Sequence, residues 1–380
     1  MKLDLTDDQQ LFQETVRRFV ETEVPISTVR GLIGDADGFD RGWWREAAAL
    51  GWTSLLVPEA LGGGSISGTG PVDLAIVAEE IGRGVAPGPL VPVNVVAETI
   101  ARSGSAEQQG GLEGVLAGET ILAWCFNELG GNWTPEGVSL QATEAADGFT
   151  LNGVKTAVEA GGQADFLLVT ATTGTDLTQF LIPADLPGIT ITAQSSLDLA
   201  RRFAEVRFDN VGVDASAVVG TVGGAQADVE RQCIVATMLQ CAETTGAVAR
   251  VFEFTVEYAF DRHSFGRPLA SYQALKHRFA DMKLWLEASH ATADGAGLAV
   301  AIDVDAARTV SVAKAYIGDK SVDIIQDCVQ LHGGIGVTWE HDIHLYLRRA
   351  TVNRGLFGTP NDHRERLAAL VGIKRKDETT

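Results

Sequence analysis

The sequence lacks several features that would define its class at once. Its four cysteines stand singly at Cys125, Cys233, Cys241 and Cys328 without a C-x-x-C pair, which argues against a zinc knuckle or a redox dithiol. We expect them to be small buried side chains in a reducing cytosol. Basic residues are also scarce, because 30 Lys and Arg stand against 50 Asp and Glu and give a formal charge of −20. Such a chain repels polyphosphates, so nucleic-acid binding is not expected.

Long apolar runs are missing as well. No segment approaches the roughly 18 uninterrupted apolar residues of a membrane-spanning helix, and the opening MKLDLTDDQQ has neither the basic nor the apolar region of a secretory signal. The sequence therefore predicts a cytoplasmic protein without a membrane span. With 380 residues and 45% hydrophobic content, the chain can form two or three packed cores.

The periodicity changes twice along the chain. Residues 1–118 carry helical patterns, and the first follows a capping box made by Thr6 and Gln9. Residues 119–218 contain short β-type runs such as DFLLVTA, TQFLIP and GITITA with turn residues between them. Residues 219–380 return to long helical patterns. We predict a mainly α protein with an N-terminal helical domain, a small antiparallel β domain and a C-terminal four-helix bundle.

Five motifs, in order along the chain, carry a family resemblance. They are GWTSLLVPE at 51–59, AEEIGRG at 78–84, RRFAEVRFDNV at 201–211, DRHSFGRP followed by SYQALKHRFADM at 261–282, and VQLHGGIG at 329–336. Together they resemble the signatures of the acyl-CoA dehydrogenases. The resemblance covers nearly the whole chain and implies an FAD-dependent enzyme acting on acyl-CoA substrates, with electron-transfer flavoprotein as the electron acceptor.

The best-preserved motifs suit the adenosine diphosphate half of FAD. Arg262 offers a planar fork of donors for a pyrophosphate, while Gly333 and Gly334 allow backbone N–H groups to approach phosphate or ribose. The resemblance implies that these motifs hold the FAD of a neighbouring subunit. The residues carried over are Arg262, Phe265, Gln273, Gln330, Gly333 and Gly334.

Two other segments suggest different kinds of site. GTVGGA at 220–225 follows a β-type run, but it is not G-x-G-x-x-G and has no βαβ surroundings, so a Rossmann fold is disfavoured and the segment is interpreted as a hinge. His341 and His344 have a spacing that a metal site on a helix could use. The WEHDIHLYLRR segment around them resembles a packing and subunit-contact segment of the family, and no metal site is predicted.

The positions that carry the catalytic carboxylate in the family are apolar here. One is the glutamate of a Y-E-G-T motif, where this chain has Phe357 in GLFGTP at 355–360. The other lies ten residues before Gly246, where this chain has Ala236. Neither residue can remove the proton α to a thioester. Glu243 lies seven residues after Ala236 on roughly the same helix face and is an alternative base.

The residues expected against the flavin ring also differ from the family pattern. FNELGGNW at 126–133 places Asn127 where the family has a threonine, and in NGVKTAVEAGG at 152–162 Ala157 and Glu159 replace a tryptophan and a hydroxyl donor. A carboxylate near the ring would oppose an anionic reduced flavin. The pattern of loss resembles the less catalytic subunit of the heterotetrameric acyl-CoA dehydrogenases of actinobacterial steroid side-chain catabolism.

Three hypotheses follow. In the first, the chain lends its adenosine-binding residues to a second acyl-CoA dehydrogenase-like subunit, which supplies the base for introducing a 2,3 double bond. In the second, the chain forms a self-sufficient homotetramer that uses Glu243 or another carboxylate. In the third, it is a non-catalytic assembly module of the same fold without flavin.

Overall fold

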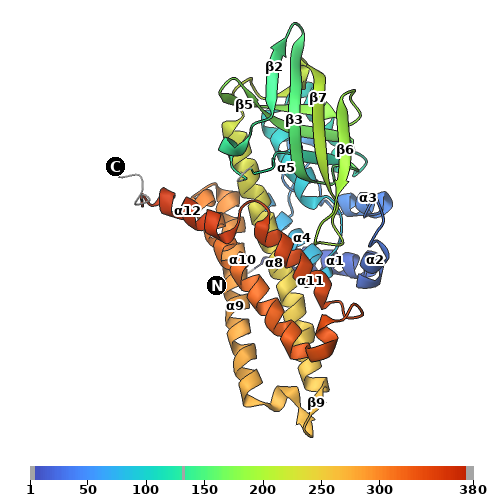
Figure 1. Ribbon diagram of the computed structural model, residues 1–380, viewed down its shortest axis with the longest axis vertical. Coiled ribbons are helices and arrows are strands. Elements are labelled where there is room, and N and C mark those ends of the chain that lie inside the picture. The colour runs from blue at the N-terminus through green and yellow to red at the C-terminus, as the bar shows by residue number, and fades with distance from the viewer. Residues whose placement is uncertain (1–4, 131–132, 374–380) are drawn as a thin grey trace.

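The N-terminal part of the chain is helical. A computed structural model describes residues 5–130 and 133–373, and Figure 1 shows its ribbon. The capping box between Thr6 and Gln9 is present at the start of the first helix. The α helices of this part are α1 (Asp7–Glu23), α2 (Ile26–Gly31), α3 (Arg41–Ala49), α4 (Gly70–Gly84), α5 (Leu90–Ser103), α6 (Ala106–Gly110) and α7 (Leu112–Leu116).

The middle of the chain forms one twisted sheet above the helices (Figure 1). Its strands are β1 (Leu122–Cys125), β2 (Gln141–Ala145), β3 (Gly148–Glu159), β4 (Phe166–Thr173), β5 (Asp176–Pro183), β6 (Ile189–Gln194), β7 (Phe203–Asp214) and β8 (Val218–Val219). Most neighbours are antiparallel, as predicted, but β4 runs parallel to both β1 and β2. The sheet is therefore mixed, because β1 enters beside β4 rather than beside its neighbour in sequence.

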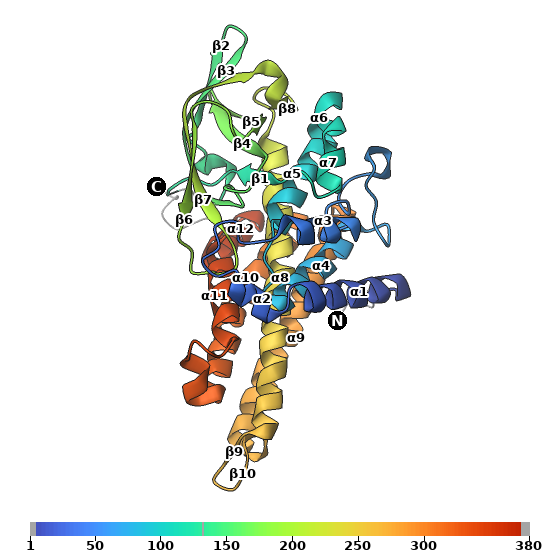
Figure 2. The same cartoon turned by 90° about the vertical axis from the view of Figure 1, so that its right-hand side faces the viewer.

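The C-terminal part is a bundle of long helices. It contains α8 (Gln226–Asp261), α9 (Gln273–Ile302), α10 (Ala306–His332), α11 (Ile343–Gly355) and α12 (Pro360–Leu370). A two-stranded hairpin, β9 (His263–Ser264) and β10 (Arg267–Pro268), joins α8 to α9. Figure 2 shows α8 running from the sheet to this hairpin at the far end of the molecule. The predicted order of helical part, sheet and bundle is confirmed.

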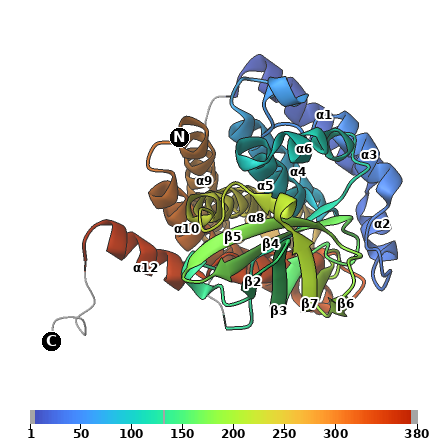
Figure 3. The ribbon, with the colours of Figure 1, turned by 90° about the horizontal axis from the view of Figure 1, so that it is seen from above.

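Helices α4 and α8 approach each other closely at two glycines. A Cβ atom on Gly82 would lie 1.9 Å from the carbonyl oxygen of Glu243, and one on Gly246 would lie 2.0 Å from that of Glu79. Neither position tolerates a side chain, because the obstructing atoms are backbone atoms. This contact fixes α8 against the N-terminal helices and places Glu243 at the centre of the molecule. Seen from above, α8 lies between the N-terminal helices and the sheet (Figure 3).

Two apolar cores support this arrangement. One joins the N-terminal helices to the bundle, and the other lies within the sheet. All four cysteines are buried and unbridged, as predicted. In residues 5–130 and 133–373, none of the helices has the length and apolar character needed to cross a membrane.

Candidate functional site: an open bundle end and a filled domain junction

The six residues predicted to contact FAD lie at one end of the bundle. Arg262 follows the last residue of α8, Gln273 begins α9, and Gln330 lies near the end of α10. The end of α10 meets the end of α8, because the ring of His332 stacks on that of Tyr258 with 4.5 Å between centroids. The side chains of Arg262, Gln273 and Gln330 are all exposed.

The two glycines at this end leave backbone open to solvent. Gly333 has a φ of +65°, a conformation that favours glycine. An added Cβ atom on Gly333 or Gly334 would meet no heavy atom within 4 Å. Backbone without side chains, at the same end of the bundle as the exposed Arg262, suits a phosphate or ribose group. The residues at this end of the bundle therefore fit the adenosine diphosphate part of FAD.

The hairpin between α8 and α9 holds Phe265 away from the bundle. Phe265 is 97% exposed and has a φ of +50°. The hydroxyl of Tyr272 donates to the carbonyl of Ser264 at 2.6 Å, and the guanidinium of Arg267 lies 3.9 Å from the centre of the Tyr272 ring. These contacts fix the hairpin, so Phe265 is presented in an ordered position although its side chain touches little of its own chain.

The junction between the sheet and the bundle is filled by aromatic rings. Phe357 lies 4.9 Å from Trp133 and 5.9 Å from Trp124, measured between ring centroids, and Trp124 stacks on Phe126 at 5.0 Å. Ala157 and Glu159 border the cavity that remains, which has a volume of about 20 Å³. Such a space holds about one water molecule. The residues in this junction therefore do not fit a flavin ring.

Hydrogen bonds from His363 and Lys314 hold the loop that carries Phe357. Phe357 has a φ of +60° and is 5% exposed. Its carbonyl oxygen lies 3.0 Å from Nε2 of His363, which donates to it, and the other ring nitrogen of His363 faces the Ser311 hydroxyl at 3.1 Å. Lys314 donates to the carbonyl of Leu356 at 2.8 Å. Burial lowers the pKa of His363 to about 3, so the imidazole stays neutral.

The segment that carries Asn127 is fixed by a buried pair. Lys155 donates to Glu128 at 2.7 Å and to the carbonyl of Phe126 at 3.0 Å. Glu128 also accepts from the backbone N–H of Leu140 at 2.9 Å. Asn127 itself follows the aromatic Phe126, and its backbone carbonyl accepts from Thr156 at 2.9 Å. These contacts hold the segment in the position that closes the junction.

A network of charges lies beside the filled junction and connects the sheet to α8 and α11. Arg349 pairs with Glu243 at 2.5 Å and also with Asp198. Arg201 pairs with the other oxygen of Glu243, and Asn353 donates to that same oxygen at 3.0 Å. All five side chains are buried. Both carboxylate oxygens of Glu243, the alternative base, are therefore engaged.

Burial and the charges of this network shift the pKa values of Asp198 and Glu159 in opposite directions. Burial alone would raise the pKa of Asp198, but Arg349 and Arg201 outweigh it and lower that pKa below its ordinary value. Burial raises the pKa of Glu159, although Arg201 lies 3.3 Å away. Motif spacing did not predict this network, because its members come from four separate segments of the chain. Two signals for the network are present in the sequence. They are Glu243, which directly precedes T-T-G at 244–246, and Arg349, the second arginine of L-R-R at 347–349.

The predicted base positions lie in packed surroundings. Ala236 is fully buried in α8, and Phe357 is part of the aromatic cluster. Ala236 precedes Arg262 by 26 positions, and a rise of 1.5 Å per residue along α8 places the two residues about 39 Å apart. The residues predicted to contact FAD and the predicted base position at Ala236 are therefore widely separated in this chain.

The two histidines considered as metal ligands make local contacts. His341 packs against His332 with 4.5 Å between ring centroids, and Nε2 of His344 lies 3.3 Å from the carbonyl of Trp339. Within the described residues, no group of three or more His, Cys, Asp and Glu side chains could hold a metal ion. His263 is exposed in the hairpin after α8.

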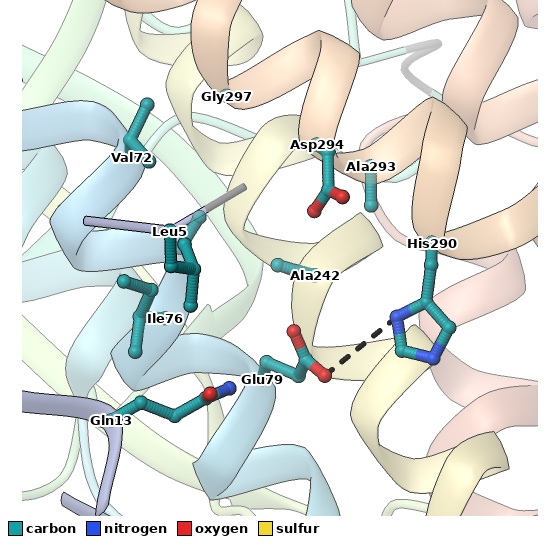
Figure 4. A pocket seen from close by; sticks show the side chains of 11 residues that line it. Leu5, Gln13, Val72, Ile76, Glu79, Ala242, His290, Ala293, Asp294 and Gly297 are labelled. Carbon is teal, nitrogen blue, oxygen red and sulfur yellow. Dashed lines mark ion pairs between the residues drawn. The ribbon is translucent and has the colours of Figure 1, made fainter. Parts of the chain in front are cut away.

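A small cavity with polar groups in its lining lies between α4, α8 and α9 (Figure 4). Its volume is about 90 Å³, and Glu79, Asp294 and His290 line it. Glu79 and Nδ1 of His290 lie 3.7 Å apart, which forms an ion pair when the imidazole is protonated. The cavity is separate from both the bundle end and the aromatic junction.

Comparison with known proteins agrees with this architecture. The model of the acyl-CoA dehydrogenase N-terminal domain matches residues 6–119, and that of the acyl-CoA dehydrogenase C-terminal domain matches residues 225–372. Acyl-CoA dehydrogenase IpdE2 of Mycolicibacterium smegmatis is 30% identical over 370 residues, which cover 97% of this chain and 100% of the relative.

Two solved structures are also similar to this chain in sequence and fold. A chain of the ChsE4-ChsE5 complex from Mycobacterium tuberculosis is 28% identical with a TM-score of 0.87, covering 99% of this chain and 100% of that one. A chain of the Tcur3481-Tcur3483 steroid acyl-CoA dehydrogenase is 28% identical with a TM-score of 0.85, covering 96% and 98%. The chain belongs to the acyl-CoA dehydrogenase family, whose members are FAD-dependent oxidoreductases acting on CH–CH bonds. The predicted resemblance to the actinobacterial steroid type is confirmed.

Proposed function

We propose that this chain is the non-catalytic subunit of a two-chain acyl-CoA dehydrogenase. In this assembly it binds the adenosine diphosphate part of an FAD whose flavin ring lies in the partner's active site. The partner supplies the carboxylate for introducing a 2,3 double bond into an acyl-CoA thioester, and electron-transfer flavoprotein accepts the electrons. The observation that carries the proposal is the contrast between the exposed bundle end and the junction reduced to about 20 Å³.

In this proposal, residues at the bundle end bind the adenosine diphosphate part of FAD, and residues at the junction exclude a flavin ring. Arg262 supplies a charged fork to the pyrophosphate, Gly333 and Gly334 supply backbone approach, and Phe265 supplies an apolar face. At the junction, Phe357 and Trp133 occupy space that a flavin ring would need. When bound, FAD supplies the hydride acceptor for the reaction. Because this chain presents no free carboxylate at Ala236 or Phe357, the proton must be removed by the partner.

The contacts of Glu243 argue against the self-sufficient homotetramer. A general base needs an oxygen within hydrogen-bond reach of the proton it removes. In Glu243, Arg349 holds one oxygen at 2.5 Å, while Arg201 and Asn353 hold the other. Freeing this carboxylate would take from Arg349 and Arg201, both buried, the charge partner that they share, which is costly.

Flavin stoichiometry tests the proposal. The chain is expressed alone and together with a family member that carries the catalytic glutamate, and flavin absorbance per chain is measured after desalting. We expect little flavin on the chain alone and one FAD per pair of unlike chains in the complex, with dehydrogenase activity only there. A full complement of FAD and activity in the chain alone would support the homotetramer. A colourless, inactive complex would support the assembly module.

A further inference from the structure

A large groove lies between α6, α7 and the sheet. Its volume is about 910 Å³, and Phe166, Leu181 and Pro183 form part of its apolar floor. Phe166 is 37% exposed. Helices α6 and α7 lie at the sheet end of the molecule, while the hairpin of β9 and β10 lies at the opposite end (Figure 2). This groove, called the acidic groove below, therefore belongs neither to the bundle end nor to the aromatic junction.

The rim of the acidic groove carries charge of one sign. Glu107, Glu113, Glu119 and Asp214 line it, and all four are exposed. In the part of the chain that the structure describes, no Lys, Arg or His lines the groove, and these four carboxylates make no ion pair there. An apolar floor below unpaired negative charge favours a ligand that combines an apolar anchor with positive charges.

The walls of the groove are tied together, so the groove exists before anything binds. Nε2 of Gln108 in α6 donates to the carbonyl of Ser216 and to that of Val218 in β8, both at 3.1 Å. The backbone N–H of Gly220 donates to the carbonyl of Ser103 at 3.0 Å. A groove that needs no rearrangement binds without the cost of ordering its own walls.

Glycines, which leave the backbone uncovered by side chains, line both sides of the groove. Gly110 of α6 and Gly212 of β7 both line it, and an added Cβ atom on either would meet no heavy atom within 4 Å. Backbone peptide groups without side chains can approach an extended peptide closely. A side chain introduced at Gly212 would enter open space and reduce the groove without displacing existing atoms.

From these observations we propose that the acidic groove binds an extended segment of a partner protein that carries Lys or Arg on both sides of an apolar residue. The apolar residue lies on the floor near Phe166, and the cationic side chains reach Glu113 and Glu119 on the rim. The volume and the apolar floor favour a peptide over a small polycation such as spermine. This proposal does not depend on flavin or on the proposed function.

The probe is a fluorescent peptide, KRGLGRK, whose binding to the full chain is measured by fluorescence anisotropy at low and physiological salt. Its counterparts are KRGSGRK, which lacks the apolar residue, EDGLGDE, which reverses the charge, and spermine as a competitor. We expect only KRGLGRK to bind well and its binding to weaken with salt, because exposed charge pairs are screened. Equal binding of KRGSGRK, or full competition by equimolar spermine, would overturn the proposal.

Two variants of the acidic groove separate the contribution of its negative charge to peptide binding from that of its open volume. The double variant Glu113→Gln/Glu119→Gln should raise the Kd roughly tenfold, and Gly212→Leu should abolish binding while keeping every charge. The matched control is Glu14→Gln/Glu257→Gln, which removes two exposed carboxylates outside the groove. Unchanged binding in Gly212→Leu, or equal weakening in the control, would contradict the proposal. A change of oligomeric state in Gly212→Leu would show instead that the groove is a contact between subunits.

Discussion

Glu243 of α8 and Arg349 of α11 form a buried ion pair at 2.5 Å, although 106 positions separate them in the sequence. Arg349 also pairs with Asp198 from the loop after β6, so one guanidinium connects the sheet to two helices of the bundle. The pair engages the carboxylate of Glu243, the alternative base. Its contacts indicate a structural role, which mutation can test.

Glu243→Gln should destabilise the chain without changing catalysis. Removing one charge leaves Arg201 and Arg349 buried without their shared partner, a loss of about 3–5 kcal/mol in the free energy of unfolding. Turnover of the two-chain complex per bound FAD should stay nearly constant. Denaturant unfolding and steady-state assays at equal FAD content measure the two effects. The exposed Glu14→Gln serves as control, and a hundredfold fall in turnover with flavin retained would return Glu243 to the role of base.

Arg262→Ala should strip FAD from the assembled complex. Loss of a charge-assisted fork to a pyrophosphate costs about 1.5–3 kcal/mol of binding free energy. The measurement is flavin absorbance per complex after desalting. Arg308→Ala removes an exposed arginine near the start of α10 and should leave occupancy unchanged. If Arg262→Ala retains full flavin, the motif has only a structural role.

Phe357→Glu should not give the chain activity of its own. The substitution restores a carboxylate at the family position, but Trp124 and Trp133 still fill the junction. A buried carboxylate among aromatic rings is unfavourable, so thermal unfolding should occur at lower temperature. Phe357→Leu, which keeps an apolar side chain, should cost less. Flavin binding or dehydrogenation by Phe357→Glu in the absence of a partner would show that the junction can open.

The stability of the chain should fall in acid partly because of His363. Its pKa is lowered from 6.5 to about 3 by burial, so between these values the unfolded chain binds a proton that the folded chain does not. Stability from this group is therefore fully present above pH 6.5 and falls as pH decreases toward 3, by up to about 1.4 kcal/mol per pH unit. Unfolding curves at pH 7, 6 and 5 measure the slope.

His363→Gln should flatten that slope, while the exposed His277→Gln should not. An unchanged slope in His363→Gln would mean that other groups cause the acid sensitivity. Nε2 of His363 can donate to the carbonyl of Phe357 in either protonation state, whereas Nδ1 can accept from the Ser311 hydroxyl only when the ring is neutral.

The long helices and the strands could be predicted because their patterns are local. The capping box at Thr6 and Gln9 and the return of helical spacing before α8 are both readable in short windows. The sequence could not predict that aromatic rings fill the junction, because Trp124, Trp133 and Phe357 meet only after the chain has folded. The sequence predicts that the base is missing at Phe357, but it does not indicate which side chains occupy the space. The domain boundaries and the roles of individual FAD-contacting residues remain predictions.

The length of α8 has a consequence for how this chain can evolve. Because a single helix runs from the filled junction to the open bundle end, its backbone hydrogen bonds keep the two regions at a fixed separation. Substitutions that accumulate around Ala236 therefore leave the geometry around Arg262 intact. A gene duplicate of a complete enzyme could lose its own chemistry step by step and remain an effective cofactor-binding neighbour for its sister chain.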